Sequence, residues 1–118
     1  MQSITLKKPT ETEIQAAIIE LLHTLGLLAW RCQAIPVPIR RGNQIIGLRR
    51  ANGYTVGIPD ILLVVRGRLI GIEVKDHKGK LSPEQEEWRD RILKAGGLWM
   101  LARSVEEVHA FLKENKLI

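Results

Sequence analysis

The chain has 118 residues, a length that suits one domain built around a single hydrophobic core. Apolar side chains make up 45% of it and charged ones 26%, which is ordinary for a globular fold and excludes wholesale disorder. Its 18 basic and 13 acidic residues leave a net charge of +5, which favours polyanionic partners such as nucleic acids.

Transmembrane and disulfide-rich classes are also disfavoured. No apolar run is long enough to span a bilayer and the N-terminus lacks a signal-peptide pattern, so we expect a cytoplasmic location. The one cysteine, Cys32, can form no internal disulfide, and we interpret it as a small core residue. We treat residues 1–118 as one domain, in which residues 1–10 form a flexible N-terminal segment.

The first periodic segment predicts a helix. Apolar side chains recur at i, i+3, i+4, i+7 and i+8 over residues 11–25, which places them on one stripe. Thr10 or Thr12 can cap its start, and Gly26 ends it. Residues 27–32 then suit a short strand.

A less regular segment follows, over residues 33–56. It contains two prolines and the turn pair Gly42-Asn43, and possible strands at residues 37–41 and 44–49 indicate an extended hairpin. We expect this hairpin to be an excursion from the main fold.

Two further strands, residues 60–65 and 68–75, are joined tightly at Arg66-Gly67. In the second strand alternate apolar side chains face one way, while Glu73 and Lys75 face the other. From this alternation we expect that the core does not bury Glu73.

The last third of the chain predicts a helix, a strand and a helix. Ser82 is a good N-cap with proline after it, and the helix ends at Gly96-Gly97. Residues 98–102 form a short apolar strand, and the final helix begins after Ser104. The order α-β-β-β-α-β plus a C-terminal helix, with the hairpin inserted, predicts an α/β fold with a mixed central sheet flanked by helices.

Asp60, Glu73 and Lys75 carry the candidate chemistry. Asp60 begins one strand and the other two share a face of its neighbour, so the three side chains can meet. Two adjacent carboxylates repel each other unless a cation lies between them, and Mg²⁺ needs only one or two carboxylates plus waters and a substrate phosphate. A lysine beside such an ion can orient or deprotonate water, which suits phosphodiester hydrolysis. The alternative is a solvated ion pair on an exposed strand face.

The combined pattern resembles a known family. Pro59-Asp60 followed by Glu73-Val-Lys75 is similar to the PD-(D/E)xK nuclease signature. Over about residues 11–112 the chain also resembles the VRR-NUC (virus-type replication-repair nuclease) family, and it does so at Glu13-Ile-Gln15, Gly26, Trp30-Arg31, Gly57-Ile-Pro-Asp60-Ile, Ile72-Glu-Val-Lys75, Gly79, Leu81-Ser-Pro-Glu-Gln85 and Ala95-Gly-Gly97.

The resemblance implies a restriction-endonuclease-like core and a metal-dependent DNA endonuclease. Asp60, Glu73 and the backbone carbonyl of Val74 would hold Mg²⁺ or Mn²⁺, and Lys75 would assist the attacking water. Compact members resemble phage and bacterial enzymes that resolve Holliday junctions as homodimers, with one active site for each strand. The implied partners are therefore branched DNA and a second copy of the chain.

Two further site residues are implied less directly. The family pattern places a glutamate on the first helix, and the Glu-x-Gln spelling points to Glu13, with Glu20 as the alternative; either can instead be an ordinary solvated residue. Gln85 faces inward and can contact a metal-bound water or the scissile phosphate, or it can only complete the capping box with Ser82.

Arginine grips phosphate through paired donors, so basic side chains are the candidate DNA contacts. Asp76 departs from expectation, because it adds a negative charge beside Lys75; it can be an outer metal ligand or face solvent. The alternative function is a non-cleaving DNA-binding module, although such a module gains little from two acids facing a phosphate backbone. The candidate DNA contacts are Arg31, Arg40, Arg41, Arg49, Arg50 and Lys78.

Overall fold

A computed structural model describes residues 7–32, 36–50 and 56–118, without the side chains of Pro36 and Arg50. Parts of the predicted N-terminal segment and of the 33–56 excursion therefore lie outside the described residues. None of the described helices is long and apolar enough to cross a membrane. The elements are α1 (Glu11–Thr24), β1 (Leu28–Arg31), β2 (Pro36–Arg41), β3 (Gln44–Arg50), β4 (Ile61–Val65), β5 (Arg68–Val74), α2 (Pro83–Lys94), β6 (Leu98–Ala102) and α3 (Val105–Glu114).

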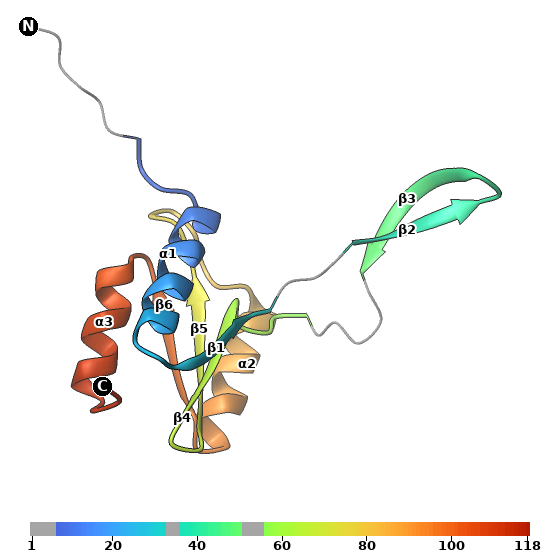
Figure 1. Ribbon diagram of the computed structural model, residues 1–118. Helices are drawn as coiled ribbons and strands as arrows, with labels where there is room; N and C mark the ends of the chain where they lie inside the picture. Colours follow the sequence, from blue (N-terminus) through green and yellow to red (C-terminus); the bar gives the residue numbers. More distant parts are fainter. Residues whose placement is uncertain (1–6, 33–35, 51–55) are drawn as a thin grey trace, which may run out of the picture.

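Four of the strands form the central sheet, in the order β1-β4-β5-β6. β1 pairs antiparallel with β4 and β4 with β5, whereas β5 and β6 are parallel, so the sheet is mixed. α1 and α3 pack together on one face, and α2 covers the other (Figure 1). The predicted α/β architecture is confirmed.

The main core lies between the sheet and the α1/α3 pair. The helical stripe of α1 meets the apolar side chains that alternate along β4 and β5. Burying one such side chain stabilises the fold by about 1.5–3 kcal/mol. The principal buried members are Ile14, Ile18, Leu22, Ile61, Leu63, Val65, Ile70, Ile72, Val74, Val108 and Leu112.

The second face of β5 is buried as well. The expectation that the core does not bury Glu73 is therefore wrong: the strand parity is right, but α2 covers the face on which Glu73 lies, and its side chain is only 2% exposed. Gly71 shows how close this layer is, because a Cβ there would lie 2.8 Å from Cγ of Pro59 and 3.0 Å from Cδ1 of Ile92.

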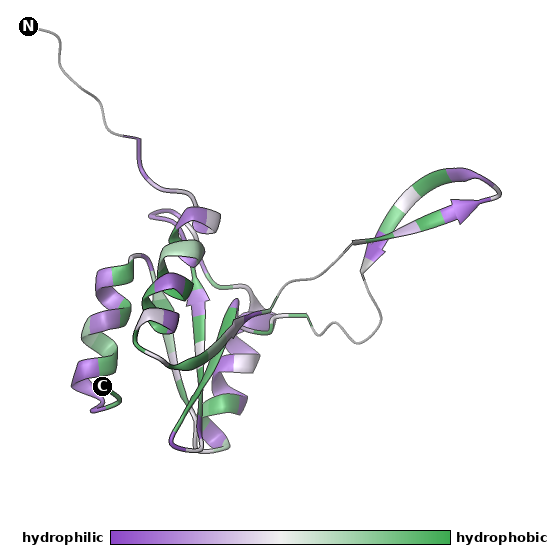
Figure 2. Cartoon of the chain, in the orientation of Figure 1, coloured by the Kyte–Doolittle hydropathy of each residue, from purple (hydrophilic) through white to green (hydrophobic). Residues whose placement is uncertain are grey.

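The predicted hairpin is also present. β2 and β3 form a separate two-stranded antiparallel sheet, with an irregular register between Ile39 and Arg40. It projects away from the body of the protein (Figure 1). Apolar and polar residues both lie along it, in the green and purple bands of Figure 2.

Candidate active site

The candidate site lies at the end of the sheet where β5 finishes and α1 begins (Figure 1). Asp60 comes directly before β4, after the buried Pro59. Its Oδ2 accepts a hydrogen bond of 2.7 Å from the backbone N–H of Val74, the last residue of β5. The N–H and C=O of a strand residue point to the same side, so the Val74 carbonyl is directed toward Asp60 as well. The structure thus brings two of the predicted groups together.

Glu73 lies beside this pair in an unusual electrostatic environment. Its Oε1 accepts a hydrogen bond of 2.9 Å from Nε2 of Gln85, while its Oε2 is buried with no hydrogen-bond partner among the described residues. Burial and, after it, the adjacent Asp60 carboxyl raise the pKa of Glu73 to about 9, and the nearby Lys75 charge opposes this rise. Glu73 is therefore costly to ionise unless a cation is added beside it.

Gln85 completes the capping box, which is one of the two alternatives that the sequence left open, and its amide also contacts Glu73. It is the third residue of α2, and its Oε1 accepts from the backbone N–H of Ser82 at 2.9 Å, which completes the capping box. Its amide group still has a donor, and this Nε2 reaches Glu73. The helix cap therefore fixes the amide that orients the buried carboxyl.

Lys75 follows β5 and is held in a tight loop. Its backbone N–H donates to the Ala102 carbonyl at 3.0 Å. Oδ1 of Asp76 accepts from the backbone N–H groups of Lys78 at 2.9 Å and Gly79 at 2.7 Å, and these bonds lower the pKa of Asp76. Asp76 is thus a turn-forming residue. A Cβ at Gly79 would lie 2.9 Å from Cδ of Lys75, so the glycine leaves room for the lysine stem.

The same loop is also held by Arg103, which is not among the predicted site residues. Its guanidinium donates to the backbone carbonyls of Asp76 and Gly79, the latter at 3.1 Å. β6 runs parallel to β5, so the residue after β6 emerges at the same end of the sheet as Lys75. The contact of Arg103 with the loop follows from the parallel pairing of β5 and β6, which cannot be read from the sequence.

The first-helix carboxylates are placed differently from the expectation. Glu13 is exposed, and its Oε1 accepts from the backbone N and the Oγ1 of Thr10 at 3.2 and 3.0 Å in a capping box. These bonds lower the pKa of Glu13. Glu20 is also exposed, and it lies nine residues after Glu11, the first residue of α1, which is about 13 Å along the helix axis.

Glu11 is instead the α1 carboxylate whose charge acts on Glu73, where it adds to the rise in the pKa. The signal for this was present in the sequence. If Thr10 is the N-cap, Glu13 is the N3 residue of a Thr-x-x-Glu capping box and is committed to the helix start. That reasoning leaves Glu11, at the first helical position, as the free acid.

The predicted DNA contacts divide into two groups. Arg31 pairs with Ile61, the residue after Asp60; its Nη2 donates to Oε1 of Gln15 at 2.9 Å, and its buried Nε has no partner among the described residues. Lys78 is exposed in the loop after Lys75. The others lie on the projecting hairpin, where Arg40, Arg41 and Arg49 are exposed and the Arg50 side chain is outside the described residues.

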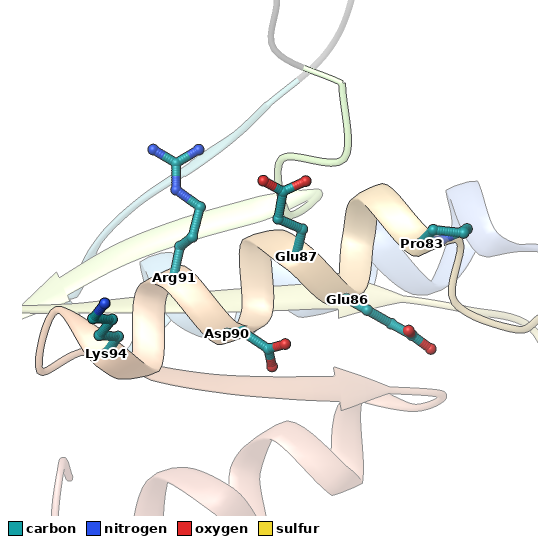
Figure 3. Close-up of a pocket in the computed structure, with 6 residues that line it drawn as sticks. All are labelled: Pro83, Glu86, Glu87, Asp90, Arg91 and Lys94. Atoms are coloured by element: carbon teal, nitrogen blue, oxygen red, sulfur yellow. The ribbon is translucent and has the colours of Figure 1, made fainter.

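Hollows elsewhere on the surface offer alternative sites. A hollow of about 360 Å³ lies along the outer face of α2, and all of its lining residues come from that helix (Figure 3). It mixes acidic and basic side chains and includes none of the predicted site residues. A smaller hollow of about 120 Å³ lies beside the Lys75 loop and is lined in part by Lys8, His77 and Arg103. The carboxylate pair therefore remains the candidate centre.

A divalent cation fits this donor set. The described residues contain no group of three or more His, Cys, Asp or Glu side chains that could hold a metal, so an all-protein cage is not formed there. Two carboxyls and one strand carbonyl are what a hard ion with several waters and a phosphate requires. The unpartnered Oε2 of Glu73 is the atom that such an ion would satisfy.

Comparison with known proteins bears on the family and the fold of the chain. The family model described as "VRR-NUC domain" matches residues 9–106. A solved structure named "VRR_NUC domain" aligns with a TM-score of 0.59 and 22% sequence identity, covering 89% of this chain and 97% of the other. None of the curated proteins matches this chain.

Proposed function

The chain belongs to the VRR-NUC family of nucleases, and from this membership we propose that it is a metal-dependent DNA endonuclease that hydrolyses phosphodiester bonds. One observation carries the proposal: the Asp60 and Glu73 carboxyls are forced together, and Glu73 is buried with one oxygen unpartnered. Without a bound cation this pair destabilises the fold, because burying a carboxyl oxygen without a hydrogen-bond partner costs free energy. A bound cation would remove the cost.

Asp60, Glu73 and the carbonyl of Val74 would hold Mg²⁺ or Mn²⁺, whose preference for oxygen ligands matches these groups. When bound, the ion would polarise the phosphate and lower the pKa of a bound water. Gln85 keeps the Glu73 carboxyl oriented through its 2.9 Å hydrogen bond. Such supporting partners commonly change metal affinity 10- to 100-fold.

The basic groups around the pair have separate tasks in this proposal. Lys75 orients or deprotonates the attacking water and steadies the charge that develops at phosphorus. Arg31, next to Asp60 in the strand pairing, would contact a substrate phosphate through the guanidinium donors that Gln15 does not occupy. Glu11, at the start of α1, is a candidate for the first-helix acid beside Glu13 and Glu20, because its charge acts on Glu73.

The proposed substrate is branched DNA of the Holliday-junction type, cut by a homodimer. The net charge of +5 supports a polyanionic substrate. A two-fold pair of identical chains would present two equivalent centres to the two strands of a symmetric junction. This assignment extends the family's nuclease activity to a specific substrate, and it needs a direct test.

The test is cleavage of labelled four-way junction, flap and plain duplex DNA, with Mg²⁺, Mn²⁺ or EDTA. We expect metal-dependent cutting with a preference for the junction. Lys75→Ala and Asp60→Ala should reduce the rate at least 100-fold, about 2.7 kcal/mol of transition-state stabilisation. Lys80→Ala, a matched loss of an exposed lysine further along the same connection between β5 and α2, should leave the rate within about threefold.

The outcomes separate the competing functions. Cleavage that persists in EDTA, or that Lys75→Ala leaves intact, would refute the assigned centre. Tight junction binding without cutting under any metal would identify a binding module instead. Equal cutting of flap, duplex and junction would retain the nuclease and reject the junction assignment. Sedimentation of the protein with the junction measures whether two chains act together.

A further inference from the structure

The β2–β3 hairpin is a structural element without a partner. Its strands pair with each other and do not join the central sheet, and neither packs closely against another described element (Figure 1). A two-stranded hairpin is marginally stable in water unless it has a further strand or surface to pack on. The hairpin therefore suits a role in which a partner completes it.

The surface of the hairpin is unusually apolar for a projecting element. The exposed fractions are 58% for Ile45, 58% for Ile46, 65% for Leu48 and 39% for Ile39. Apolar side chains grouped on a protruding surface commonly mark an interaction site. They also lie among arginines, so the partner has to accept apolar contact and positive charge together (Figure 2).

The charge of the hairpin decides between possible partners. The chain carries no acidic residue between Glu20 and Asp60, and four arginines lie in the hairpin strands: Arg40, Arg41, Arg49 and Arg50. Docking of one hairpin on the same hairpin of a second copy would bring these positive charges together. A polyanion is attracted by the same distribution.

The shape of the hairpin favours duplex DNA among polyanions. The major groove admits a two-stranded β-ribbon. The tip, Arg40–Gln44, carries arginine, asparagine and glutamine, which are the side chains that contact phosphates and base edges. Exposed isoleucine and leucine can contact thymine methyl groups in the same groove.

We infer that the β2–β3 hairpin is a DNA-binding arm that enters the major groove of the duplex beside the cleaved phosphodiester. This rests on the proposed nuclease function and adds a contact away from the carboxylates. The seven residues of β3 span about 23 Å, which corresponds to about seven base-pair steps. The arm therefore sets a minimum length of duplex next to the branch point.

The test measures DNA binding in the Lys75→Ala background, so that cutting does not interfere. Arg40→Ala/Arg41→Ala removes two charges at the tip, and Lys94→Ala/Lys113→Ala removes two exposed charges at the ends of α2 and α3 as the matched control. Two lost phosphate contacts should reduce the slope of log affinity against log salt by about 1.8 and the affinity at 0.15 M salt by about 30-fold. The control should change affinity less than about threefold.

A second measurement varies the duplex length. Junctions with arms of about 12 base pairs should bind the parent much more tightly than junctions with arms of about 5, because the shorter arms end before the hairpin does. Arg40→Ala/Arg41→Ala should abolish most of this difference. A merely structural role of the arginines would not produce such a length dependence.

Several results would overturn the inference. If the tip variant has the salt slope and length dependence of the control, the hairpin does not bind DNA. If Ile45→Ser/Leu48→Ser changes the sedimentation mass while DNA affinity stays constant, a second copy covers the hairpin instead. When the Lys75→Ala protein binds DNA and the wild type cuts it in these cases, only the arm is rejected. A wild type that neither binds nor cuts any of the substrates refutes the nuclease function together with the arm.

Discussion

Replacement of Glu73 by glutamine should stabilise the metal-free protein and abolish its activity. The amide keeps the shape of the side chain and is neutral at every pH, whereas the buried Glu73 carboxyl must take up a proton when the chain folds above pH 4.5. Its oxygen can still accept from Gln85, and its new N–H₂ group replaces the unpartnered Oε2 beside Asp60. The cost of protonation and the unpartnered oxygen are removed by the same change, so both contributions favour the variant.

The effect has a definite pH dependence. The folded pKa of Glu73, about 9, lies above its ordinary value of 4.5, so the folded protein keeps a proton that the unfolded chain releases between these values. Stability from this group is therefore complete below pH 4.5 and is lost as the pH rises toward 9, by up to about 1.4 kcal/mol per pH unit. Relative to Glu73→Gln, the wild-type free energy of unfolding should fall by about 2–3 kcal/mol from pH 6 to pH 8.

Urea denaturation in EDTA at several pH values measures this difference, and subtraction of the two curves removes the contributions that both proteins share. Glu114→Gln, an exposed glutamate on α3, is the control and should run parallel to the wild type within about 0.5 kcal/mol. Addition of Mg²⁺ at pH 8 should stabilise the wild type and leave Glu73→Gln nearly unchanged. If the wild-type curve runs parallel to that of Glu73→Gln over this pH range, the pKa of Glu73 is not raised in the folded protein.

Three glycine substitutions should separate stability from activity. Gly57 has φ of +87°, and a Cβ there would lie 2.5 Å from backbone atoms of Glu84. Gly57→Ala should therefore cost about 3 kcal/mol or more of unfolding free energy. Gly26 has φ of +75° but open space around it, so Gly26→Ala should cost about 1–2 kcal/mol. Gly79→Ala should instead displace the stem of Lys75 and slow cleavage by about tenfold or more, while unfolding free energy changes by less than about 1.5 kcal/mol. Urea unfolding and single-turnover cleavage test both, and a stable, fully active Gly57→Ala or Gly79→Ala would contradict these contacts.

Much of the fold could be predicted because local signals agree with tertiary packing. The 3.6-residue stripe of α1, the alternation in β4 and β5 and the cap at Ser82 each specify one structure, and burial then selects that structure. The hairpin was predictable from the turn at Gly42-Asn43, which adopts the positive φ of +60° at Gly42. The separation of this hairpin from the central sheet could be expected only because residues 33–56 have the least regular sequence pattern in the chain.

The site was less predictable, because it depends on which layer covers each face. Alternation correctly assigned Glu73 to the face opposite the main core, but alternation does not reveal that α2 covers that face. The contact of Arg103 with the Lys75 loop likewise depends on the parallel pairing of β5 and β6. Such non-local contacts leave no periodic pattern in the sequence.

The two capping boxes explain why one N3 residue serves the site and the other does not. Glu13 and Gln85 each use one side-chain oxygen to accept the backbone N–H of the N-cap residue, Thr10 or Ser82. The atom left over in Glu13 is a second carboxylate oxygen, which another carboxyl would repel. The atom left over in Gln85 is an N–H₂ donor, and it bonds to Glu73. The choice of amide or carboxylate at N3 thus determines whether the start of the helix can stabilise a buried acid.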